Sequence, residues 1–77
     1  MEMSKEIVQY LISRLMNNAT EAWDEAEADR QDKFKSGRAT AYYEMLDVLQ
    51  SELDVYEQDL KEYGLDADLL QKMQRIA

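Results

Sequence analysis

The segment ATAYYEMLDVLQSELDVYEQDLKEY, residues 39–63, decides the fold of this chain. Its apolar residues alternate spacings of three and four without a miss: Ala39, Tyr42, Leu46, Leu49, Leu53, Tyr56, Leu60 and Tyr63. Such spacing places side chains on one face of an α-helix. A second set recurs every seven residues beside that stripe: Phe34, Ala41, Val48 and Val55, with Met45 between them. We therefore predict a helix over about residues 31–63 whose apolar face is too broad for one partner helix.

The end of this helix is marked by Gly64, which stands where a left-handed residue belongs, followed by the apolar Leu65 of a Schellman cap. Asp66 or Asp68 can then cap a short helix. Its apolar residues share one face: Leu69, Leu70, Met73 and Ile76. The sequence predicts this third helix over about residues 66–76.

The N-terminal part predicts another long helix, over about residues 3–28, with Ser4 as its N-cap. Its apolar stripe follows a 4-3-4-3-4 spacing: Val8, Ile12, Leu15, Ala19, Ala22 and Ala26. Leu11, Met16 and Trp23 widen this stripe. Because the stripe changes from bulky residues to alanine, we expect a neighbouring helix to approach closest at the alanine end.

Two places can hold the corner between the long helices. Gly37 could end the first helix at residues 36–37, as glycine often does. Alternatively the corner lies at residues 29–32, with Asp29 or Asp32 capping the second helix. We favour the second placement, because Phe34 is in phase with the seven-residue recurrence that follows it. Gly37 would then lie inside a helix, where it costs about 1 kcal/mol relative to alanine, and a close crossing by Ala19, Ala22 and Ala26 would compensate.

The same region carries the pattern F-x-x-G-R-x-x-A-Y-Y-E-x-L-D, formed by Phe34, Gly37, Arg38, Ala41, Tyr42, Tyr43, Glu44, Leu46 and Asp47. This pattern, with the later Gly64-Leu65-Asp66, resembles the centre of short all-helical proteins of Gram-positive bacteria and their mobile elements. The resemblance covers less than half of the chain. It implies an ordered, packed role for Gly37 and brings no catalytic residue.

Composition points to an oligomer of one small all-α domain, residues 1–77. A chain of 77 residues buries only about 60% of its unfolded surface, so it gains stability from disulfides, a metal or a second subunit. It contains no cysteine and no histidine, which excludes disulfides and the commonest metal ligands. We expect an antiparallel helical hairpin with a short C-terminal helix, paired into a dimeric four-helix-type bundle.

The sequence argues against several functions. There is no histidine to act as a general base or in a di-iron bundle motif, so we predict no enzyme activity, no cofactor and no metal site. One glycine among Lys33, Lys35 and Arg38 is not a phosphate-binding loop, and these basic side chains should pair with acidic neighbours. The chain has 17 acidic and 9 basic residues, a net charge of −8, which disfavours nucleic acid and anionic membrane. No segment reads as a signal peptide or membrane span, and we expect a cytoplasmic protein.

Two function classes remain. The first is a non-enzymatic interaction protein that forms a homodimer. Its predicted contact residues lie on or beside the apolar stripes: Tyr10, Leu11, Trp23, Phe34, Gly37, Ala41, Tyr43 and Met45. The second is an acidic inhibitor or immunity-type protein that binds a basic site on a toxin or nucleic-acid enzyme, as the charge of −8 and the acid-rich residues 21–32 suggest.

Overall fold

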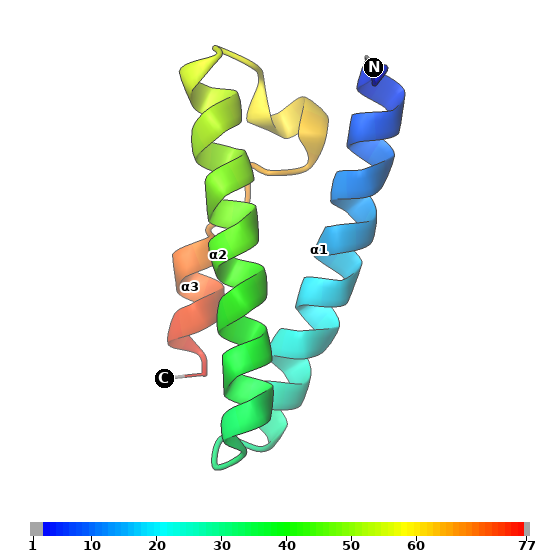
Figure 1. Cartoon of the computed structure of the whole chain (residues 1–77). Helices are drawn as coiled ribbons and strands as arrows, with labels where there is room; N and C mark the ends of the chain where they lie inside the picture. Colours follow the sequence, from blue (N-terminus) through cyan, green and yellow to red (C-terminus); the bar gives the residue numbers. More distant parts are fainter. Residues whose placement is uncertain (1–2, 77) are drawn as a thin grey trace.

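Two antiparallel helices run the length of the molecule, and the C-terminal part of the chain packs on them (Figure 1). A computed structural model describes residues 3–76, which contain no strand. The elements are α1 (Lys5–Ala28), α2 (Lys33–Val55), a 3₁₀ turn η1 (Leu60–Tyr63) and α3 (Leu69–Gln74). The molecule measures 41 × 20 × 16 Å. The predicted all-α architecture of two long helices and a short third one is confirmed.

The corner between the long helices lies at residues 29–32, as predicted. Asp29 ends α1 by donating its backbone N–H to the Glu25 carbonyl at 3.1 Å. The Asp32 side chain accepts the N–H groups of Phe34 and Lys35 at 2.9 and 3.1 Å and so begins α2. At the other end of α1, the predicted cap Ser4 accepts the N–H of Ile7 at 3.2 Å. Side-chain capping fixes both helix starts.

The predicted helix over residues 31–63 is wrong at its C-terminal end, because α2 stops at Val55. Glu57 has a φ of 60°, and its N–H donates to the Asp54 carbonyl at 2.9 Å. The next N–H, from Gln58, donates to the Leu53 carbonyl at 2.9 Å. These two bonds form a Schellman cap with glutamate in place of glycine. As a result Tyr56, predicted on the core stripe, lies beyond the helix and is 73% exposed.

The predicted Schellman cap at Gly64 is present, but it ends η1. Gly64 has a φ of 71°, and the Leu65 N–H donates to the Leu60 carbonyl at 2.9 Å. The Asp68 side chain then accepts the Gln71 N–H at 3.1 Å and begins α3, so of the two candidate caps Asp68 is used. Since α3 spans only Leu69–Gln74, it is shorter than the predicted 66–76.

The core lies between α1 and α2 and is closed at two places by η1, the segment after it and α3. Its buried residues are Ile12, Ala19, Ala22, Trp23, Ala26, Ala39, Leu46, Tyr63, Leu65 and Leu69. The alanine stripe of α1 is thus buried as predicted. The predicted close crossing at Gly37 is wrong: Gly37 is exposed, and a Cβ placed there would meet nothing within 4 Å. Of the small α2 residues near Gly37 only Ala39 is buried, and its carbonyl accepts a hydrogen bond from Trp23 of α1.

Candidate interaction surface

A second stripe runs along the outside of α2, which we call the outer stripe. Its seven residues alternate spacings of four and three: Phe34, Arg38, Ala41, Met45, Val48, Glu52 and Val55. Three of them are large and mostly solvent-exposed, with Phe34 at 77%, Val48 at 59% and Val55 at 71%. Met45 is 46% exposed. A repeat of this kind is the spacing with which one helix packs against another.

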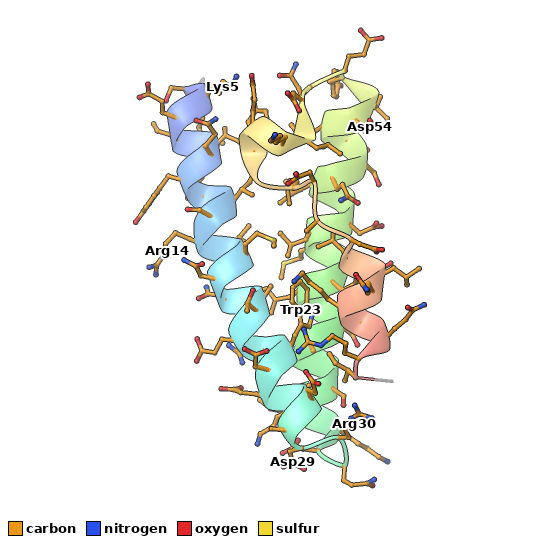
Figure 2. The ribbon with its side chains drawn as sticks, turned by 180° about the vertical axis from the view of Figure 1, so that it is seen from behind. Lys5, Arg14, Trp23, Asp29, Arg30 and Asp54 are labelled. Carbon is orange, nitrogen blue, oxygen red and sulfur yellow. The ribbon has the colours of Figure 1, made fainter. Side chains whose placement is uncertain are left out.

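The outer stripe is turned away from the core side of the same helix. At about 100° per residue, it lies about 110° around α2 from the stripe that contains Ala39, Leu46 and Leu53. In a four-helix bundle each helix contacts two neighbours at roughly right angles around its axis. In Figure 1 α2 lies in front of α3, whereas Figure 2 shows the opposite side, with α3 in front of α2. One side of the hairpin is therefore not covered by α3.

The first turns of α1 also carry exposed apolar residues. Ile7 and Leu11, one turn apart, are 50% and 44% exposed, and Tyr10 is 62% exposed. An ion pair ties the outer stripe to the other end of α1: Arg38 Nη1 lies 2.9 Å from Glu25 Oε2. The Arg38 guanidinium also lies 5.6 Å from the Tyr42 ring centre. These contacts hold Arg38 at the edge between the two helices.

Six of the eight predicted contact residues lie at the surface: Tyr10, Leu11, Phe34, Gly37, Ala41 and Met45. Trp23 does not, because it is only 3% exposed and its Nε1–H donates to the Ala39 carbonyl at 3.1 Å. Figure 2 shows it pointing inward from α1, while Arg14 points away. The Lys72 ammonium lies 5.8 Å from the Trp23 ring centre. Tyr43 is half-buried against the core and does not belong to the outer stripe.

The sequence pattern alone does not assign Ile7, Val48 and Val55 to a contact surface. Val48 and Val55 belong to a broad apolar face of α2, but which part of that face stays exposed depends on where α3 packs. Arg38 and Glu52 complete the regular spacing of the outer stripe. Because both residues are charged, the spacing of the apolar residues alone does not reveal the complete stripe.

Two of the three basic residues near Gly37, Lys35 and Arg38, pair with acidic side chains as predicted, whereas Lys33 forms no ion pair within residues 3–76. Lys35 Nζ lies 3.4 Å from Asp29 Oδ2, and Arg38 pairs with Glu25. At the opposite end of the molecule Lys5 pairs with Glu62, and this hydrogen bond raises the pKa of the Lys5 ammonium. Arg75 pairs with Glu27 and lies 3.8 Å from Asp24, which holds the end of α3 against α1.

The remaining features of residues 3–76 that bear on function are acidic clustering, surface depressions and helix hydropathy. Among residues 3–76 no three acidic side chains gather in a way that could hold a metal ion. Two open depressions border α3, with volumes of about 410 Å³ and 260 Å³. The larger is lined by Ala67, Asp68, Gln71, Lys72 and Arg75. Neither α1 nor α2, the two long helices of the described chain, has the apolar length needed to cross a membrane.

Comparisons with family models, with curated proteins and with solved structures gave no match to this chain. The resemblance to short helical proteins of Gram-positive bacteria stays a prediction.

Proposed function

We propose that this protein is a non-enzymatic cytoplasmic protein that acts through protein–protein contact and self-associates through the outer stripe. The first turns of α1 extend the contact surface, and the product is a dimeric bundle of four long helices. The observation that carries the proposal is the regular row of exposed apolar residues along α2, from Phe34 to Val55. Contiguous exposed apolar surface on a small protein marks an interaction site.

The energetics of this surface support a dimer of moderate strength. Fully burying a valine or phenylalanine side chain contributes about 1.5–3 kcal/mol. Each copy offers Phe34, Val48 and Val55, so a dimer buries six such side chains. Because these side chains are already partly buried in the single chain, each contributes only about two thirds of that free energy. Association costs at least about 4 kcal/mol in lost freedom. A surplus of about 6–8 kcal/mol, the upper end of this balance, corresponds to a Kd of about 1–40 µM.

Analytical ultracentrifugation between about 1 and 100 µM tests the proposal, a range that brackets micromolar affinity. We expect a concentration-dependent species of about 18 kDa, twice the chain mass of 9.1 kDa. Val48→Glu should shift it to the monomer, because it places a charge in the middle of the outer stripe. Leu70→Glu is the matched control, since Leu70 is 56% exposed but lies on α3. A monomer of wild-type protein throughout this range would overturn the proposal.

A second candidate function is binding to a basic protein, as an inhibitor or immunity-type protein would. It is favoured by acidic side chains in the C-terminal half of α2 and just after it: Asp47, Asp54 and Glu57 are exposed, and none forms an ion pair within residues 3–76. Affinity purification from the native host at low and high salt tests it. A basic protein bound at low salt and released at high salt is expected, and recovery of no basic protein would contradict it.

A further inference from the structure

Resting on the proposed self-association, we propose that the partner of the outer stripe is the outer stripe of a second copy, packed antiparallel to it. The twofold axis passes near Met45. Arg38 of each copy then lies beside Glu52 of the other, so that two intermolecular ion pairs flank the axis.

The order of charges along the stripe carries this inference. Arg38 stands seven residues before Met45, and Glu52 stands seven residues after it. Both lie on the same side of the stripe, within about 40° of each other at 100° per residue. Antiparallel pairing about Met45 brings opposite charges together at both places. Parallel pairing brings Arg38 onto Arg38 and Glu52 onto Glu52, which is repulsive at both.

The apolar residues of the outer stripe favour the same arrangement. About an axis near Met45, Phe34 of one copy meets Val55 of the other, and Ala41 meets Val48. Each contact then combines a larger with a smaller side chain, which allows continuous packing along the stripe. Parallel pairing would stack Phe34 on Phe34 and Ala41 on Ala41. The two phenylalanine side chains would hold the helices apart, whereas the two alanine side chains touch only if the helices are close.

The stripe is long enough for a stable interface. From Phe34 to Val55 it extends about 32 Å at 1.5 Å per residue, most of the 41 Å length of the molecule. A stable interface buries about 800 Å² per partner, about one seventh of the accessible surface of 5576 Å². The adjacent Ile7 and Leu11 of α1, beside the C-terminal half of α2, widen the surface available for this contact.

One pair of side chains opposes the arrangement. Glu44 precedes Met45 and lies at the other edge of the stripe, about 80° from Phe34. The two copies of Glu44 therefore approach each other near the axis. This repulsion predicts that Glu44→Gln tightens the dimer, by about two- to fivefold for an exposed pair. No change or a weaker dimer would contradict this placement of the axis.

Charge reversal tests the ion pairs. Glu52→Arg should weaken the dimer by about tenfold or more, since two pairs per dimer become repulsive. It does so although the net charge becomes less negative, −6 (−8 + 2) in place of −8, which reduces the general repulsion between the two copies. Arg38→Glu should also weaken it, and the double variant should restore the wild-type Kd within about threefold. Glu21→Arg makes the same charge change on α1 and should leave the dimer intact.

Because Arg38 also pairs with Glu25 in its own chain, thermal unfolding of each variant must accompany the Kd measurement. A cysteine experiment gives an independent result, since the chain contains no cysteine. Ala41→Cys mixed with Val48→Cys should form the mixed disulfide under mild oxidation, because antiparallel pairing places these positions side by side. The Ala41→Cys homodimer should not cross-link, because its two sulfurs lie about 12 Å apart along the axis.

The outcomes separate this inference from the proposed function. A wild-type monomer overturns both. A wild-type dimer whose affinity does not respond to Glu52→Arg overturns the antiparallel arrangement alone, as does rapid cross-linking of the Ala41→Cys homodimer. Weakening by Glu52→Arg together with the mixed Ala41–Val48 disulfide supports the arrangement.

Discussion

At the scale of single residues, Glu57 is the position where the sequence and the backbone disagree. Among residues 3–76 it is the one non-glycine with a positive φ, at 60°. A left-handed conformation costs a residue with a Cβ about 1–2 kcal/mol, partly offset in glycine by its greater freedom in the unfolded chain. We expect Glu57→Gly to raise the free energy of unfolding by about 0.5–1 kcal/mol, a Tm increase of about 3–6 °C.

Thermal unfolding followed by circular dichroism measures this effect. Glu21→Gly is the control, because Glu21 is an exposed residue inside α1, where glycine should lower the free energy of unfolding by about 1 kcal/mol relative to a good helix former. If both glycine variants are destabilised alike, the Schellman cap at Glu57 is wrong.

Glu57 also shows which caps can be predicted from the sequence. Ser4, Gly64 and Asp68 were predictable because each is the residue type that its local hydrogen bond favours. A glutamate in the left-handed cap position carries no such signal. The apolar spacing continues through Tyr56 to Tyr63, so the spacing alone predicts a helix that ends eight residues beyond Val55, the last residue of α2.

At the scale of elements, the sequence predicts which residues are buried better than it predicts where each helix ends. Leu60 and Tyr63 pack on the core as their spacing indicated, but they do so from η1 after a chain reversal. Both apolar faces of α2 were visible in the sequence. Which of them stays exposed could not be predicted, because the choice depends on the packing of α3, a helix of six residues whose position is set by contacts distant in sequence.

The segment before α3 is held by one side chain of α2. Gln50 Nε2–H₂ donates to the carbonyls of Leu65 and Ala67 at 2.8 and 3.1 Å. Gln50→Ala leaves two half-buried acceptors without their donor, at a cost of about 1–2 kcal/mol. Urea unfolding followed by Trp23 fluorescence measures this loss. Gln9→Ala, which removes a single bond to the exposed carbonyl of Glu62, should cost less, and equal losses would contradict the bridging role of Gln50.

At the scale of the whole molecule, charge distinguishes the two proposed functions. Two chains of net charge −8 repel each other when they associate, although Arg38 and Glu52 attract locally. Raising NaCl from about 0.1 to 1 M shortens the Debye length from about 10 to 3 Å and strengthens apolar contacts. We therefore expect the dimer Kd to fall by about three- to tenfold in sedimentation equilibrium. The Glu21→Arg variant has a net charge of −6 (−8 + 2), so its dimer Kd should fall less steeply as salt rises.

Binding to a basic partner has the opposite salt dependence, because salt weakens attraction between unlike charges. A dimer that dissociates as salt rises would show that ion pairs, and not the apolar residues of the outer stripe, hold the two copies together.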